Sequence, residues 1–162
     1  MLLYHGSNVV VEQPILIPQR RALDFGPGFY LTSSRKQAEK WSRVVRLRRQ
    51  SGNAILNIYE FDSLKATKLN ILHFDSADAD WLEFVCSNRK RGGAYDGYDI
   101  VIGPVANDST LPVINDYMDG IYTIEEAIKR LLPQNLTDQY SLLTEAALSC
   151  LSFIGKEDVA WE

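Results

Sequence analysis

The chain has few residues of the kinds that bind metals or form disulfides. Its 162 residues include two cysteines, Cys86 and Cys150, and two histidines, His5 and His73. Both cysteines lie among apolar neighbours typical of a helix, so we expect two reduced, buried thiols. A zinc site of Cys and His ligands would need all four of these scattered residues, and we therefore expect no metal site.

The sequence also lacks long apolar runs and linker segments. No run approaches the roughly 20 apolar residues that a membrane-spanning helix needs. The first residues lack the charged leader and apolar core of a signal peptide, so we expect a soluble, cytoplasmic protein. The 6 prolines and 10 glycines form no linker, and 46% of the residues are hydrophobic. We expect one globular domain over residues 1–162.

Positive charge is in deficit overall but concentrated in one half of the chain. The formal net charge of −4 excludes a generally basic nucleic-acid-binding coat and a disordered polyelectrolyte. Most of the 17 basic residues fall within residues 1–91, and most of the 21 acidic ones within residues 92–162. One basic segment is either a solvated helix face or an anion site for a dinucleotide diphosphate or nucleic-acid phosphates. Its members are Arg35, Lys36, Lys40, Arg43, Arg46, Arg48 and Arg49.

Residue patterns predict strands dispersed among helices. Because there is no regular βαβ rhythm, we expect an α+β domain with a mixed or antiparallel sheet. Short apolar and β-branched runs predict strands over residues 2–4, 28–32, 54–61, 68–72, 98–105, 138–143 and 151–154.

Capping signals and helical periodicity predict the helices. One helix is expected from a Ser33 or Ser34 cap to about Gln50, and a second from a Ser76 cap. The capping box formed by Thr123 and Glu126 predicts a third helix that ends at Pro133. A short fourth helix is expected over residues 144–151.

Three motifs remain as candidates for chemistry. They are His5-Gly6-Ser7 at a strand end, the Gly26-Pro27-Gly28-Phe29-Tyr30 turn and strand, and Trp41 on the following helix. Taken singly, each has a structural interpretation: a satisfied histidine, a glycine turn and core aromatics.

Together and in this order, the motifs resemble the ADP-ribosyltransferase superfamily, in the branch of the poly(ADP-ribose) polymerases and diphtheria toxin. The signature of that branch is H-G-[ST], then a G-x-Y strand and an aromatic residue one helix later. Over nearly the whole chain, the sequence looks still more like a bacterial family grouped with these enzymes, some of whose members are regarded as toxins of toxin–antitoxin pairs. The resemblance implies an ADP-ribosyltransferase-like split β-sheet core with flanking helices, and NAD⁺ as co-substrate.

The resemblance also implies roles for individual residues in NAD⁺ binding. His5, assisted by Ser7, would hydrogen-bond a ribose hydroxyl, while the backbone of Gly6 would bind the carboxamide. Tyr30 and Trp41 would enclose the nicotinamide ring between them.

Further positions complete the implied site. Gly28 belongs to the glycine turn, and Gln139 would contact the 2′-hydroxyl of the nicotinamide ribose. Arg20 and Arg21 lie where the family places adenosine and diphosphate contacts. A hydroxyl that the family often has before the stacking aromatic is replaced by Ala38, so one carboxamide bond is missing.

Gln139 occupies the position at which the family has a catalytic glutamate. An amide can hydrogen-bond a ribose hydroxyl but carries no charge to stabilise a developing cation. Asp138, Glu145 and Glu83 are alternative sources of a carboxylate.

These observations predict a mono-ADP-ribosyltransferase that transfers ADP-ribose from NAD⁺ to a macromolecular acceptor, protein or nucleic acid, and releases nicotinamide. A toxin of this kind would have an antitoxin protein as partner. Three alternatives stay open: an NAD-binding or protein-interaction module without turnover, an NAD glycohydrolase, and an RNA 2′-phosphotransferase on a related fold.

Overall fold

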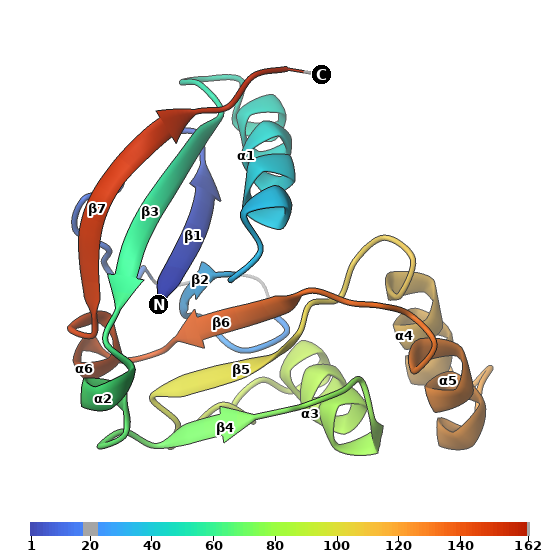
Figure 1. The fold of residues 1–162 in the computed structure, drawn as a ribbon. Coiled ribbons are helices and arrows are strands. Elements are labelled where there is room, and N and C mark those ends of the chain that lie inside the picture. Colours follow the sequence, from blue (N-terminus) through green and yellow to red (C-terminus); the bar gives the residue numbers. More distant parts are fainter. Residues whose placement is uncertain (18–22, 162) are drawn as a thin grey trace.

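Two β-sheets form the framework of the protein, which Figure 1 shows as a computed structural model that describes residues 1–17 and 23–161. One sheet has the strand order β1-β3-β7, and the other β2-β6-β5-β4. The strands are β1 (Leu2–Ser7), β2 (Phe29–Leu31), β3 (Ile55–Phe61), β4 (Ile71–His73), β5 (Ile100–Pro104), β6 (Asp138–Leu142) and β7 (Leu151–Asp158).

The three-stranded sheet is antiparallel throughout, with β3 between β1 and β7. On β1, His5 lies opposite Asn57 and Gly6 lies opposite Leu56. Side chains alternate between the two faces of a strand. His5 and Gly6, although adjacent in the motif, are therefore directed to opposite faces of this sheet.

The four-stranded sheet is mixed. β4 and β5 run parallel, whereas β6 is antiparallel to both β5 and β2. Tyr30 of β2 lies opposite Ser141, and Gln139 of β6 lies opposite Gly103. The predicted α+β class with a mixed sheet is confirmed.

A β-bridge between Tyr4 and Thr32 joins the two sheets. The amide nitrogen of each residue donates to the carbonyl oxygen of the other at 2.9 Å. Since Tyr4 precedes His5 and Thr32 follows β2, this bridge brings the His-Gly-Ser strand beside the G-x-Y strand.

The longest helix, α1, begins and ends where local signals place it. The Ser34 side chain accepts a hydrogen bond from the Gln37 amide, and Gln50 closes the helix in the left-handed conformation. α1 packs on β1 and β3, and Figure 1 shows it along one face of the three-stranded sheet. The helices are α1 (Arg35–Arg49), α2 (Ser63–Ala66), α3 (Ala79–Lys90), α4 (Leu111–Met118), α5 (Ile124–Leu131) and α6 (Glu145–Leu148).

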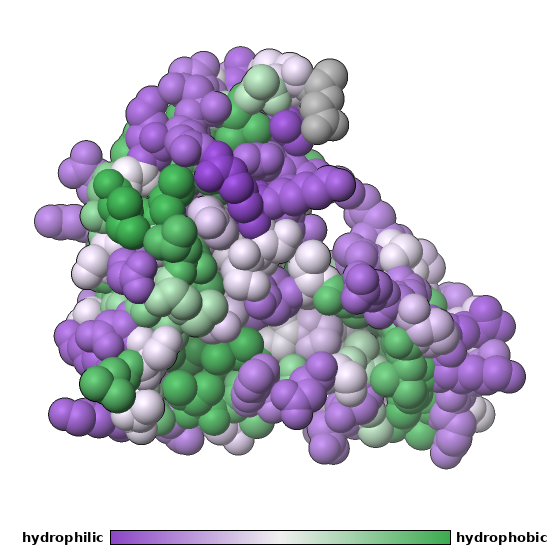
Figure 2. All heavy atoms as spheres, in the orientation of Figure 1, coloured by the Kyte–Doolittle hydropathy of each residue, from purple (hydrophilic) through white to green (hydrophobic). Residues whose placement is uncertain are grey.

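Most of the buried apolar residues in the described part of the chain form two clusters, and β5 contributes to both. Val101 belongs to a cluster with α3, α4 and α5, which surrounds the buried Trp81. Ile100 belongs to a second cluster that contains Leu3 and Tyr59 of the three-stranded sheet. On the face shown in Figure 2, hydrophilic side chains predominate over α1 and hydrophobic ones gather over β3 and β7.

Several predicted boundaries differ from the structure. β1 continues through His5 and Gly6 to Ser7, because β3 supplies a partner for each of these residues. β4 is shifted to Ile71–His73, and β7 extends to Asp158.

Other differences concern helices. α3 is capped by Asp78, whose side chain accepts from the Trp81 amide at 3.0 Å, rather than by Ser76. Cys150 is buried as expected but lies in the turn after α6 and not within a helix. α4 was not predicted: its cap residue Thr110 makes no side-chain capping bond. The short helix α2 was not predicted either.

The α5 prediction is confirmed with one difference. The Thr123 hydroxyl accepts from the Glu126 amide at 3.2 Å, as in a capping box. The Glu126 carboxylate, however, pairs with Arg130 at 3.0 Å and does not reach back to the cap. No helix in the described part of the chain has the length and apolar character needed to cross a bilayer.

Candidate functional site

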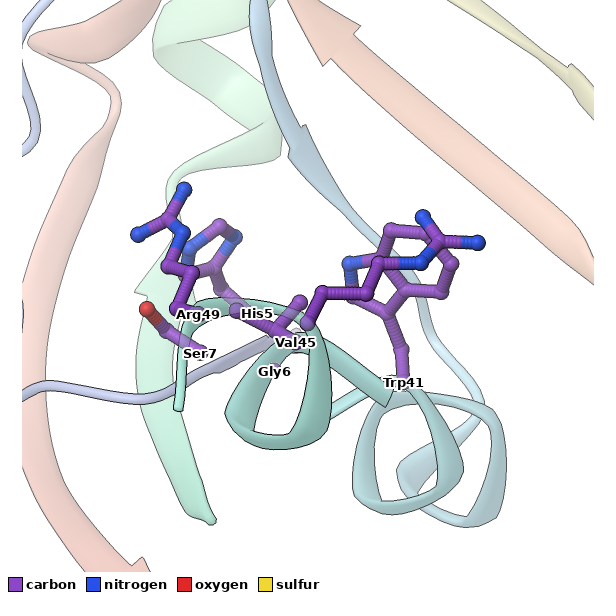
Figure 3. A pocket seen from close by; sticks show the side chains of 7 residues that line it. His5, Gly6, Ser7, Trp41, Val45 and Arg49 are labelled. Atoms are coloured by element: carbon purple, nitrogen blue, oxygen red, sulfur yellow. The ribbon is translucent and has the colours of Figure 1, made fainter. Parts of the chain in front are cut away.

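A cavity of about 160 Å³ lies between β1 and α1 and contains the first of the predicted motifs. Figure 3 shows the His5 ring beside Arg49, and Trp41 on the other side of Val45. Strand and helix thus contribute one wall each. The cavity is lined by His5, Gly6, Ser7, Trp41, Val45, Arg48 and Arg49.

Gly6 determines how closely α1 approaches β1. A Cβ atom at this position would lie 2.1 Å from the Ala38 carbonyl oxygen and 2.8 Å from the Ser42 amide nitrogen. Only glycine leaves room for the helix backbone here. The structure thus shows close approach of the helix backbone at Gly6, and the predicted backbone contact of Gly6 with a ligand remains a prediction.

His5 is held by the strand that carries Tyr30. Its Nδ1 lies 2.7 Å from the Tyr30 carbonyl oxygen, and its ring lies 4.3 Å from the Phe29 ring. Because a carbonyl oxygen only accepts, Nδ1 carries the proton, which leaves Nε2 of the neutral ring as a hydrogen-bond acceptor.

The surroundings of His5 disfavour its protonated form. The pKa of His5 is lowered to about 4: burial has the largest effect, the hydrogen bond to the Tyr30 carbonyl opposes it, and the nearby positive charge of Arg49 adds to the lowering. At neutral pH, the imidazole is therefore a neutral group with one fixed donor and one free acceptor.

Trp41 presents an aromatic face at the cavity. The residue is 42% exposed, which is unusual for a residue of this size. The Arg48 guanidinium carbon lies over the indole, 5.2 Å from its centroid. This distance is that of a cation–π contact, so the same face could hold another cationic or aromatic ring.

Tyr30 lies close to His5 through its backbone, but its side chain does not line the cavity. The Tyr30 hydroxyl donates to the Gly26 carbonyl at 2.6 Å and accepts from the Phe25 amide at 3.1 Å. Burial raises the pKa of this phenol well above its usual range, so it stays protonated. Tyr30 thus closes the glycine turn that precedes β2.

Gly28 lets this turn pack against β6. A Cβ at Gly28 would lie 2.3 Å from the Ser141 hydroxyl oxygen and 2.7 Å from the Leu142 carbonyl oxygen. Gly28 therefore positions the turn but does not line the cavity.

Gln139 lies on β6, opposite Gly103, and is half-buried. Since Tyr30 lies opposite Ser141, alternation directs Gln139, Ser141 and Tyr30 to the same face of the four-stranded sheet. Gln139 does not line the cavity, and no hydrogen bond joins its amide to His5 or Tyr30 within the described residues. The structure therefore brings His5, Gly6, Ser7 and Trp41 together and leaves Tyr30 and Gln139 on the adjoining sheet.

The three alternative carboxylates have structural surroundings of their own. Asp138 accepts from the Thr32 hydroxyl at 3.0 Å and from the Ser33 amide at 2.8 Å, and it also binds the Ser33 hydroxyl. Glu83 accepts from the Tyr117 hydroxyl, and Glu145 lies in the first turn of α6. Asp138 thus fastens the β2–α1 corner to β6.

Two further predictions concern arginines and metals. Arg20 and Arg21 lie outside the described residues. Among residues 1–17 and 23–161, no group of three or more His, Cys, Asp or Glu side chains could hold a metal ion.

Burial raises the pKa of Cys86 to about 11 and also raises that of Cys150, so both thiols stay protonated.

The cavity includes residues that were not predicted as site residues. Val45, Arg48 and Arg49 follow Trp41 at helical spacing and line the same wall. The basic segment was recognised as a candidate anion site, but the sequence did not indicate which of its arginines line the cavity.

The fold and cavity define an α+β protein with a small site between a strand and a basic helix. A family model described as "Protein of unknown function (DUF3990)" matches residues 1–153, so the chain belongs to the DUF3990 family. No curated protein and no solved structure matches the chain.

Proposed function

We propose that this protein is an NAD⁺-dependent mono-ADP-ribosyltransferase with a macromolecular acceptor. One observation carries the proposal: His5, Gly6 and Ser7 of β1 and Trp41 of α1 line a single cavity. These are the residues to which the resemblance assigns the ribose, carboxamide and ring contacts. We also propose that the two joined sheets correspond to the split sheet of an ADP-ribosyltransferase-like fold.

The size of the cavity fits one ring and not a whole dinucleotide. Cavities of roughly 150 Å³ hold a benzene molecule in other proteins, and the volume here is about 160 Å³. In the proposed complex, the nicotinamide ring would enter beside Trp41, and the rest of NAD⁺ would extend outside. Nε2 of His5 is the free acceptor available to a ribose hydroxyl.

The proposed reaction needs orientation more than a strong base. The bond between the ribose carbon and the nicotinamide nitrogen breaks, and its electron pair neutralises the pyridinium. A new bond forms between that ribose carbon and a nucleophilic atom of the acceptor, which loses its proton to solvent. Trp41 and His5 would hold ring and ribose in place while positive charge develops on the sugar.

Labelled co-substrate tests this proposal directly. The purified chain is incubated with NAD⁺ labelled in the adenine and with cell lysate, and free nicotinamide and label in the protein and nucleic-acid fractions are measured. We expect both signals, and we expect His5→Ala and Trp41→Ala to reduce them at least tenfold. If neither nicotinamide release nor label transfer occurs with the folded wild-type chain, the proposal is wrong. Release without label transfer would identify a glycohydrolase instead.

The neutral Gln139 favours one other function. Among the described cavity-lining residues there is no carboxylate, and Asp138 is engaged at the β2–α1 corner. An NAD-binding module without turnover would have these properties. Tight NAD⁺ binding by calorimetry, with no nicotinamide release, would select this alternative.

We also propose that this enzyme is toxic to its host and is neutralised by a partner protein, as the resemblance to toxins of toxin–antitoxin pairs implies. Expression of the wild-type chain alone should arrest growth, whereas expression of folded His5→Ala should not. Equal growth with both chains, at matched levels of folded protein, would contradict the toxin part of the proposal.

A further inference from the structure

We propose that Arg48 and Arg49 form an anion site at the rim of the cavity for the phosphate or diphosphate of a ligand whose aromatic ring replaces the Arg48 guanidinium on Trp41. The proposal rests on the proposed function for the ligand, NAD⁺, and on the contacts of the two arginines for the site itself. It concerns a part of the site that the sequence motifs do not cover.

Arg49 is held in position by a neutral group. Its Nη1 donates to the Asn8 side-chain oxygen at 3.0 Å. Asn8 is only 5% exposed, and its amide nitrogen donates to the Ser51 carbonyl at 3.1 Å. The buried amide therefore orients the guanidinium without neutralising its charge. That charge extends to the cavity, since it contributes to the lowered pKa of His5.

Arg48 is likewise free of carboxylate partners in the described part of the chain. Its guanidinium rests on the Trp41 ring, 5.2 Å from the centroid, and the residue is exposed. Three of the other described arginines pair with carboxylates: Arg35 with Glu39 at 3.0 Å, Arg89 with Asp24 at 2.6 Å, and Arg130 with Glu126 at 3.0 Å. Two arginines that are consecutive in sequence, line the same cavity and have no carboxylate partner among the described residues favour an anionic ligand.

The dimensions of the cavity leave the anion outside it. A volume of about 160 Å³ accepts one ring, so the charged groups attached to a nucleotide's ring and ribose must lie outside. The exposed face of Trp41 holds one partner at a time, and a ligand ring must displace Arg48. The released guanidinium can then pair with phosphate oxygens, beside the fixed Arg49, in the bidentate geometry that suits both groups.

This exchange predicts that Arg48→Ala raises the affinity for one probe and lowers the affinity for two others. Calorimetry of the full chain at low salt uses nicotinamide, ADP-ribose and inorganic pyrophosphate as probes. Arg48→Ala should bind nicotinamide about threefold more tightly, because the ring no longer competes with the guanidinium. The same variant should bind ADP-ribose and pyrophosphate about tenfold more weakly.

Arg49 and Arg46 provide the comparison. Arg49→Ala should weaken the binding of ADP-ribose about tenfold. Arg49→Lys keeps the charge but loses the planar guanidinium, so it should weaken this binding several-fold. Arg46→Ala removes the same charge from the same helix outside the cavity lining and should change each affinity less than twofold. If Arg49→Ala does not fold, Arg48→Ala and Arg49→Lys decide the question.

Three results would overturn the inference. The first is a wild-type chain that binds neither ADP-ribose nor pyrophosphate. The second is an equal loss of ADP-ribose affinity in Arg46→Ala and Arg48→Ala. The third is weaker nicotinamide binding in Arg48→Ala than in the wild type. A wild-type chain that binds ADP-ribose through the arginine pair but releases no nicotinamide from NAD⁺ would refute the enzyme and support the anion site. Nicotinamide release from NAD⁺ that is unchanged in both arginine variants would support the enzyme and refute the anion site.

Discussion

At the scale of single residues, the chemical state of His5 follows from two contacts. The Tyr30 carbonyl fixes the proton on Nδ1, and burial opposes a second proton. A neutral imidazole would suit the proposed nicotinamide site, because a charged imidazole would repel the cationic ring. The protonation of His5 is therefore linked to the stability of the fold.

The lowered pKa of His5 predicts how stability depends on pH. The unfolded histidine titrates near 6.5 and the folded one near 4, so this contribution is complete above pH 6.5 and is lost as the pH falls from 6.5 to 4. With about 1.4 kcal/mol per pH unit, the loss at pH 4.5 is roughly 2 to 3 kcal/mol. Urea unfolding from pH 7.5 to 4.5 should show a smaller loss for His5→Gln than for the wild type.

His73→Gln is the matched control for this measurement, since His73 is exposed on β4. Across the same pH range, its free energy of unfolding should fall by as much as that of the wild type. If His5→Gln and the wild type lose equal stability, the histidine is not kept neutral by its surroundings.

Gln139 offers a prediction about rate. If the site performs the proposed transfer, Gln139→Glu should raise nicotinamide release by about tenfold or more, because a carboxylate stabilises the developing positive charge. Gln134→Glu adds the same charge after α5 and should leave the rate unchanged. A steady-state assay of nicotinamide release makes the comparison. No gain in a folded Gln139→Glu chain would mean that Gln139 is not at the reacting sugar.

At the scale of elements, the contact between β1 and α1 creates the cavity. Gly6 lets the helix backbone approach the strand closely, and Arg48 and Arg49 of the same helix line the cavity. The helix therefore has two functions. It covers the three-stranded sheet and supplies one wall of the site.

This contact predicts the effect of adding one methyl group. Gly6→Ala would place Cβ 2.1 Å from a helix carbonyl oxygen, so α1 must shift. We expect a loss of about 1 to 3 kcal/mol or more in the free energy of unfolding, and weaker nicotinamide binding. Chemical denaturation and calorimetry measure the two effects.

Gly155→Ala is the corresponding control, because a Cβ at that position on β7 would meet no atom within 4 Å. Its stability should stay within about 0.5 kcal/mol of the wild type. A Gly6→Ala chain as stable as Gly155→Ala would show that α1 is not in close contact with β1.

At the scale of the whole molecule, one strand connects the two apolar clusters. Ile100 and Val101 are consecutive on β5 and are fully buried in different clusters. The Tyr4–Thr32 bridge adds a backbone link between the sheets. Neither cluster can lose its packing without disturbing β5.

This arrangement predicts a single unfolding transition. Ile100→Ala and Leu82→Ala, one in each cluster, should each lower the free energy of unfolding by about 2 to 5 kcal/mol. In both variants, far-UV circular dichroism and tryptophan fluorescence should report the same midpoint. Separate midpoints, with Leu82→Ala affecting only the earlier one, would mean that the clusters unfold independently.

Local signals determined much of the secondary structure. The Ser34 cap and the spacing of Ala38 and Trp41 were sufficient to predict α1, because a helix depends on neighbours three and four residues apart. The Thr123 cap likewise predicted α5. β1 was predicted too short, because glycine disfavours strands and only its register with β3 extends the strand through Gly6.

The sequence by itself determined the α+β class, the principal helix and the motifs whose residues line the cavity. The tertiary structure decided which of them meet: His5 and Trp41 share a cavity with Arg48 and Arg49, while Tyr30 turns into its own loop. The physical reason is the sequence separation over which each interaction acts. Caps and periodicity act within a few residues, whereas the cavity exists because a strand and a helix distant in sequence pack at a glycine.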